Sequence, residues 1–130
     1  MVPTVAWEDG VVVMIDQRRL PREEVFLRCR DHQEVAVAIK DMAIRGAPAI
    51  GVAAALGLAL GLRTTRSEGT SLRHEWSDMC ATFAATRPTA VNLFWAIERM
   101  RRRFQELEAV GAETLRHGLL QEALAVQRED

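Results

Sequence analysis

The chain has 130 residues, 48% hydrophobic and 27% charged, which is enough for one packed core and short for two. Seventeen basic and eighteen acidic side chains leave a formal net charge of −1, which excludes a surface that attracts nucleic acid as a whole. The N-terminus lacks a signal-peptide pattern, and the longest apolar stretch, residues 47–62, is short for a bilayer span and carries three glycines. We therefore expect a cytoplasmic protein without membrane or nucleic-acid partners.

The two cysteines, Cys29 and Cys80, lie far apart and lack the spacing of metal ligands. A reducing compartment also disfavours a disulfide between them. We expect two buried thiols, and the sequence predicts neither a metal site nor a cofactor.

The first thirty residues are rich in β-branched side chains and interrupted by turn formers, a pattern typical of short strands. Strands are expected at residues 5–7, 11–15 and 25–29, with Gly10 in the hairpin that joins the first two. Three short strands are not stable alone, so their apolar face must pack on the rest of the chain or on another chain.

From Asp31 onward the apolar period becomes helical, and Asp31 is a candidate N-cap for a helix that ends near Arg45. Pro48 suits the first turn of a second helix ending near Leu62, whose many small side chains predict a buried, central position. Further helices are expected at residues 72–85, from an N-cap at Thr89 to residue 107, and at 112–126. Their predicted inward seams are Leu72, Trp76, Met79 and Phe83; Leu93, Ile97, Met100, Phe104 and Leu107; and Leu115, Leu119, Ala123 and Val126.

These elements predict an α+β fold, in which a small N-terminal antiparallel sheet of about three strands (residues 1–30) is followed by a bundle of about five helices (residues 31–130). The basic cluster at residues 99–103 lies toward the C-terminal end of its helix, where positive charge complements the helix dipole. We interpret it as a solvated face. The tryptophans Trp7, Trp76 and Trp95 are interpreted as core residues.

An arginine twice stands just before a helix start made of proline and small residues. Residues 45–49 read Arg-Gly-Ala-Pro-Ala, and residues 87–90 read Arg-Pro-Thr-Ala. The first N–H groups of a helix lack acceptors inside the helix and carry the positive end of its dipole, so both starts are candidate anion sites. The pattern is short, and the alternative is that proline merely starts each helix while Arg45 and Arg87 are surface residues.

With their flanking residues, these segments resemble the two N-terminal motifs of the methylthioribose-1-phosphate isomerase family: Arg-Gly-Ala-Pro-Ala-Ile-Gly at 45–51 and Arg-Pro-Thr-Ala-Val-Asn-Leu at 87–93. The start of the chain is similar as well, with Trp7 before a hairpin, then Asp16-Gln17 and Leu20-Pro21. Relatives in the wider superfamily usually begin with helices and commonly have serine in place of Asn92. The resemblance covers essentially the whole chain.

The resemblance implies the N-terminal domain of an isomerase that converts methylthioribose 1-phosphate to methylthioribulose 1-phosphate in methionine salvage. The substrate-binding residues that it implies are Arg45, Gly46, Ala47 and Arg87. It places the catalytic Thr-His-Cys-Asn and Asn-Gly-Asp motifs in a C-terminal Rossmann-like domain, and neither occurs in this sequence. We therefore expect no catalytic residue here and no turnover by the chain alone.

His32, His74 and His117 fall on separate helices and form no substitute acid–base pair. The expected partners are a phosphorylated sugar and the C-terminal catalytic domain, in cis or in trans, and a homodimer is possible because the absent domain would leave an apolar surface. Three alternatives stay open: a non-catalytic regulatory or assembly module of the same superfamily, a domain of a ribose-1,5-bisphosphate isomerase, and a purely structural helical domain.

Overall fold

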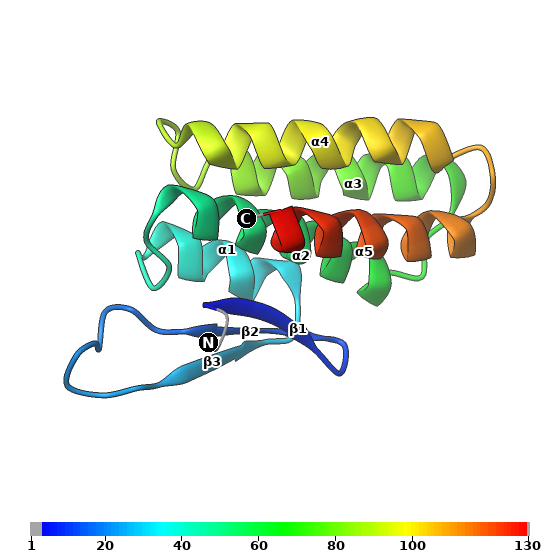
Figure 1. The fold of residues 1–130 in the computed structure, drawn as a ribbon. Coiled ribbons are helices and arrows are strands. Elements are labelled where there is room, and N and C mark those ends of the chain that lie inside the picture. The colour runs from blue at the N-terminus through cyan, green and yellow to red at the C-terminus, as the bar shows by residue number, and fades with distance from the viewer. Residues whose placement is uncertain (1–3, 130) are drawn as a thin grey trace.

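A computed structural model describes residues 4–129 and has the expected α+β architecture, with three strands followed by five helices. Figure 1 shows the sheet covering one side of the helical bundle. The elements are β1 (Val5–Glu8), β2 (Val11–Ile15), β3 (Phe26–Cys29), α1 (His32–Lys40), α2 (Ala47–Thr64), α3 (Gly69–Ala84), α4 (Val91–Leu107) and α5 (Ala112–Glu129).

The sheet is antiparallel with strand order β1-β2-β3, so β2 is central. In its register Val12 lies opposite both Trp7 and Cys29. Alternate residues of β2 therefore face the helices, and Val12 and Met14 are fully buried against them. This contact is what stabilises strands too short to stand alone.

Helix α2 is the centre of the molecule, as its small side chains predicted. Every residue from Ile50 to Leu62 is buried, and the helix contacts the other four helices as well as β1 and β2. By length and composition α2 is long and apolar enough to cross a membrane, and within residues 4–129 only α2 meets that criterion. Its apolar surface is already covered in this fold by the neighbouring elements.

The helical seams predicted from the sequence are confirmed on α3, α4 and α5. All of their members are buried except Leu107, which is partly buried at the end of α4. Trp76 stacks on Phe104, with ring centroids 4.7 Å apart and planes 9° apart, so these two aromatic rings join α3 to α4.

The predicted end of the first helix is wrong. Asp31 caps α1 as expected, accepting from the backbone N–H of Glu34 at 2.8 Å, but α1 ends at Lys40 instead of near Arg45. Met42 has a φ of 64° and is 45% exposed, while Ala43 and Ile44 are fully buried. Burial of these two residues in the core requires the chain to leave the helix, and this packing against distant residues overrides the helical spacing of Met42.

Three details of α4 also differ from the sequence-based expectation. Its N-cap is Ala90 and not Thr89. Trp95 is 49% exposed and not a core residue. Arg99 is not solvated, because it donates to Glu122 and Glu129 at 2.7 Å and ties α4 to α5. The spacing of Arg99 on its own helix carries no information about these acceptors on another helix.

We expect the substitution Gly57→Ala to destabilise the fold. A Cβ at position 57 would lie 2.5 Å from the ring of Phe83, which is fully buried and cannot move aside. Overpacking of this kind costs about 1–3 kcal/mol, which exceeds or offsets the helix-propensity gain of about 1 kcal/mol. Chemical denaturation should therefore show a lower free energy of unfolding.

Gly118→Ala on α5 is the matched control for Gly57→Ala. An added Cβ there meets only the end of the partly buried Leu107 side chain, which can rotate away. This variant should be neutral or slightly stabilised, and an equal loss in both variants would contradict the central packing role of Gly57.

Candidate functional site

The two arginine-led segments precede helix starts that lie side by side. Figure 1 shows α2 and α4 beginning at the same end of the bundle and running in the same direction. Gly51, in the first turns of α2, packs so closely on α4 that an added Cβ would be 3.1 Å from the carbonyl oxygen of Asn92. The fold therefore brings together the N-terminal ends of the two helices that the sequence singled out.

The start of α2 is open to solvent. Gly46 is its N-cap with φ 94° and ψ 131°, a backbone conformation that favours glycine, and Pro48 lies in the first turn. Gly46, Ala47 and Pro48 are all exposed, and no cap side chain accepts from the first turn. The N–H groups at this end are therefore accessible to an external acceptor.

The start of α4 also lacks a side-chain cap, because its N-cap is Ala90. The preceding turn is closed by a bond from the Ala90 N–H to the carbonyl of Arg87 at 3.0 Å. The Nη1 atom of Arg87 is shielded from solvent and finds no acceptor in residues 4–129. A buried donor without an acceptor is unfavourable, and among the described residues Nε1 of Trp76 is in the same situation in the core.

The start of α3 also lacks a side-chain cap hydrogen bond, but it differs in its charge. Its N-cap is Glu68, whose side chain makes no cap hydrogen bond but places a carboxylate beside the helix end. That negative charge disfavours an anion, whereas Arg45 and Arg87 favour one at α2 and α4.

Arg45 is exposed, and its Nη2 atom donates to the backbone carbonyl of Gln17 at 3.1 Å. This contact links the turn after β2 to the residue just before α2. Sequence reasoning did not find Gln17, because the two residues are 28 positions apart and a backbone acceptor leaves no signal in the side-chain pattern.

Exposed apolar side chains gather on α4 close to its start. Val91, Phe94 and Trp95 are 78%, 41% and 49% exposed, and the guanidinium of Arg99 lies 5.5 Å from the Trp95 ring centroid. This patch begins at the first residue of α4 and so adjoins the paired helix starts.

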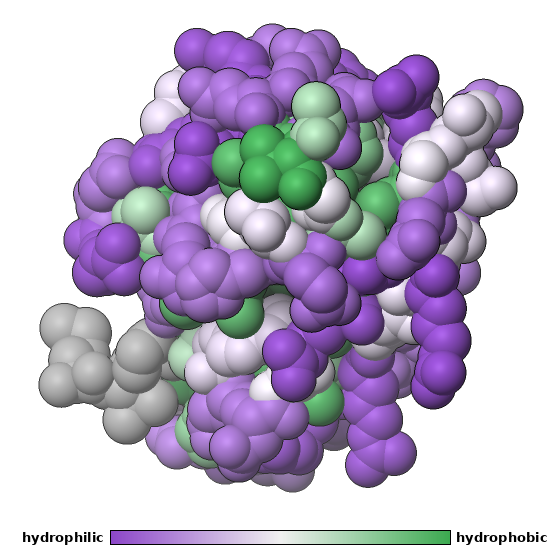
Figure 2. Space-filling model, turned by 90° about the vertical axis from the view of Figure 1, so that its right-hand side faces the viewer, coloured by the Kyte–Doolittle hydropathy of each residue, from purple (hydrophilic) through white to green (hydrophobic). Residues whose placement is uncertain are grey.

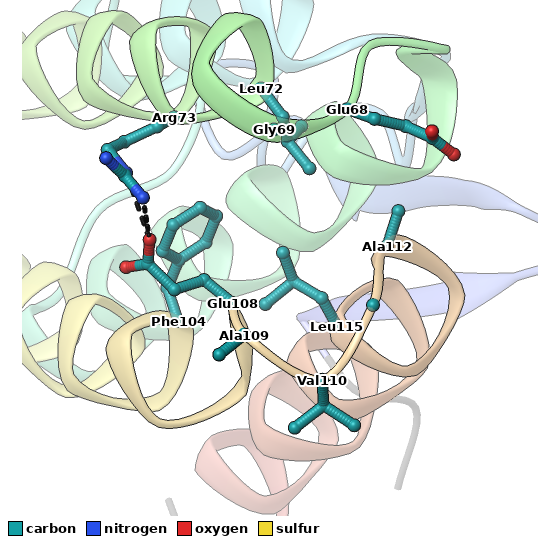
Figure 3. A pocket seen from close by; sticks show the side chains of 11 residues that line it. Glu68, Gly69, Leu72, Arg73, Phe104, Glu108, Ala109, Val110, Ala112 and Leu115 are labelled. Carbon is teal, nitrogen blue, oxygen red and sulfur yellow. Dashed lines mark hydrogen bonds and ion pairs between the residues drawn. The ribbon is translucent and has the colours of Figure 1, made fainter.

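A cavity of about 440 Å³ lies near the other end of α4, between the start of α3 and the α4–α5 loop. In Figure 3, Arg73 and Glu108 reach toward each other beside it, and their ion pair is 2.6 Å long. Figure 2 faces this end of the molecule, where hydrophobic atoms form a small patch among hydrophilic side chains. The cavity is separate from the paired helix starts, because Asn92 and Glu108 are 16 residues apart, about 24 Å along the α4 axis.

Both thiols are buried, and the three imidazoles lie on three different helices. Cys29 and Cys80 are buried as expected, and burial raises the pKa of each thiol to about 11. Burial also lowers the pKa of His32 on α1, while His74 and His117 lie apart from it on α3 and α5. Within residues 4–129, no three His, Cys, Asp or Glu side chains are placed to hold a metal ion.

The fold and the paired helix starts define an α+β domain in which a short antiparallel sheet covers a bundle built on one apolar helix. The model of the Initiation factor 2 subunit family matches residues 43–130, and the chain belongs to this family.

Curated relatives named methylthioribose-1-phosphate isomerase match the chain over almost its full length. That of Koribacter versatilis is 50% identical over 100% of this chain, and that of Trichlorobacter lovleyi is 51% identical over 98%. In both cases the match spans 37% of the relative, so the chain corresponds to somewhat more than a third of these proteins.

Two solved structures agree with the fold. The 5-methylthioribose 1-phosphate isomerase of Pyrococcus horikoshii superposes with a TM-score of 0.96, at 37% identity over 100% of this chain and 37% of its own. The translation initiation factor eIF-2B subunit delta of A. fulgidus superposes with a TM-score of 0.91, also at 37% identity and over 100% of this chain and 38% of its own. Because the second structure matches the N-terminal strands too, the sheet alone does not separate the two kinds of relative.

We expect both thiols to be unreactive in the folded protein. With a pKa of about 11, each is almost entirely protonated at pH 8, and the thiolate is the reactive form. A chromogenic disulfide reagent should label no cysteine under native conditions and two after unfolding in guanidinium. Rapid labelling of Cys29 or Cys80 in the native chain would contradict their interpretation as core residues.

Proposed function

We propose that this chain is the phosphate-binding N-terminal part of a methylthioribose-1-phosphate isomerase. The observation that carries the proposal is the contact between the first turns of α2 and α4, at Gly51 and Asn92. It puts two uncapped helix starts, each preceded by an arginine, at one place on the surface. Relatives about 50% identical over this segment carry that enzyme name.

In this proposal the substrate phosphate accepts hydrogen bonds from the N–H groups at the α2 start. Gly46 and Ala47 leave the backbone accessible, and Arg45 and Arg87 supply charged donors from two sides. The Nη1 of Arg87 gains the acceptor that residues 4–129 do not provide. These residues bind and orient the sugar phosphate, and none of them moves the proton between the sugar carbons.

The proton transfer of an aldose–ketose isomerisation needs an acid–base pair held against the sugar. The resemblance assigns that pair to a cysteine and an aspartate in a C-terminal Rossmann-like domain, outside the 130 residues of this chain. The exposed residues Val91, Phe94 and Trp95 adjoin the proposed site and are suited to contact that domain. The reaction belongs to methionine salvage in the cytoplasm.

Binding is tested by titrating the 130-residue chain with methylthioribose 1-phosphate, followed by calorimetry and amide chemical shifts. Arg45→Ala and Arg87→Ala should each weaken the affinity about tenfold, because hydrogen bonds to charged groups are worth roughly 1.5–3 kcal/mol and Arg45 is partly screened by solvent. The control is Arg102→Ala, which removes an exposed arginine of α4 that makes no ion pair within residues 4–129.

A parent chain that does not respond would contradict the site, as would an equal loss in the Arg102→Ala variant. Tighter binding of ribose 1,5-bisphosphate than of methylthioribose 1-phosphate would move the assignment to the bisphosphate isomerase branch.

Catalysis is tested by complementation. The chain alone should produce no methylthioribulose 1-phosphate, because the resemblance places the acid–base pair in the C-terminal domain. Adding the remaining part of the Koribacter versatilis relative as a separate polypeptide should restore turnover, and Arg87→Ala in this chain should reduce the restored rate. Turnover by the purified chain alone would show that the catalytic assignment is wrong.

A regulatory or assembly role is the second candidate, favoured by the match to the structure titled translation initiation factor eIF-2B subunit delta. It predicts phosphosugar binding without any turnover, even when the remaining part of the isomerase is present. The two experiments together separate these candidates.

A further inference from the structure

The turn that follows β2 is built around a buried charge. Asp16 is 1% exposed, and it is the only buried polar or charged residue among those described. Its carboxylate accepts from Arg18 three times: from the backbone N–H at 3.0 Å, from Nε at 2.9 Å and from Nη2 at 2.8 Å. A buried carboxylate is stable only when it is paired and hydrogen-bonded in this way, so the pair fixes the conformation of the turn.

The middle residue of this turn, Gln17, uses both of its backbone groups on the loop before α2. Its N–H donates to the carbonyl of Ala43 at 2.8 Å, and its carbonyl accepts from Nη2 of Arg45 at 3.1 Å. Ala43 is itself fixed, because it is fully buried and its N–H donates to the carbonyl of Ala38 at 2.9 Å. The turn and the loop are therefore joined at two points on either side of Ile44.

Anchoring matters for Arg45 because its side chain is long and exposed. A free arginine loses rotamer freedom when it binds an anion, whereas an arginine already held by Gln17 has lost part of that freedom beforehand. A guanidinium has five N–H donors, so one bond to Gln17 leaves four for a phosphate.

We propose that Asp16 and Gln17 are positioning residues for Arg45. The ion pair between Asp16 and Arg18 holds the turn, and the Gln17 carbonyl orients the Arg45 guanidinium at the start of α2. Neither Asp16 nor Gln17 touches the substrate. This inference rests on the proposed phosphate site, and it gives the N-terminal sheet a role in binding as well as in stability.

The test is a double-mutant cycle with inorganic phosphate as the probe, measured by amide chemical shifts of the 130-residue chain. Asp16→Asn keeps the size of the side chain and removes its charge, and it should weaken phosphate binding about three- to tenfold. In the Arg45→Ala background, the same substitution should have no further effect, because its effect passes through Arg45. The Nε–H relaxation of Arg45 should also report a more mobile side chain in Asp16→Asn.

The control for a general loss of stability is the variant Glu129→Gln. This substitution weakens the 2.7 Å ion pair between Glu129 and Arg99 on α4. This variant should lower the melting temperature and leave both phosphate affinity and Arg45 relaxation unchanged. Should Asp16→Asn not fold, the cycle is run with Arg18→Lys, which retains a positive charge beside Asp16 and loses the fork geometry.

The outcomes separate this inference from the proposed function. If Arg45→Ala weakens phosphate binding but Asp16→Asn does not, or weakens it equally with and without Arg45, the positioning role is overturned and the phosphate site stands. If neither Arg45→Ala nor Arg87→Ala changes phosphate binding, the proposed site fails, and the positioning role fails with it.

Discussion

The structure depends on the burial of α2. This helix is apolar around its whole circumference, and a helix of that kind is stable in water only when other elements cover every side. Its glycines and alanines let the neighbours approach closely, as the position of the Phe83 ring against Gly57 shows. Glycine weakens the helix intrinsically, so α2 is held by its packing and not by its propensity.

The same constraint places the candidate site. Close packing of α4 on the small residues of α2 aligns the first turns of both helices, with Gly51 against Asn92. A larger residue at position 51 would push the two helix starts apart. The proximity of the two helix starts, which Arg45 and Arg87 precede, is therefore a consequence of core packing.

Most of the fold could be predicted from local patterns. The seams of α3, α4 and α5 follow the helical period, and the Asp31 cap and the position of Pro48 follow from backbone chemistry. The prediction of where α1 ends failed, because contacts with residues distant in the sequence determine that end. Met42 fits the helical period of α1, yet burial of Ala43 and Ile44 ends that helix earlier.

The arginines show the same limit. Arg45 and Arg87 could be selected from the residues that follow them, because an open helix start is a local feature. The acceptors of Arg45 and Arg99 could not be predicted from the sequence. Gln17 lies 28 positions from Arg45, and Glu129 lies 30 positions from Arg99. Nothing in the spacing of the arginines distinguishes Arg99 and Arg103, which pair with Glu122 of α5, from the neighbouring arginines that remain in solvent.

The two ends of α2 differ in how their polar groups are satisfied. At the C-terminal end, Arg116 donates to the carbonyls of Leu62, Thr65 and Ser67 at 2.9 to 3.1 Å, so that the protein caps its own helix. At the N-terminal end, Gly46 offers no side-chain cap, and Arg87 on the neighbouring turn keeps a buried donor that finds no acceptor within residues 4–129. Because the N–H groups at the α2 start are exposed, water or an external acceptor can satisfy them without any rearrangement of the protein. A phosphate bound there, as proposed above, would meet the positive end of the helix dipole and the nearby arginines.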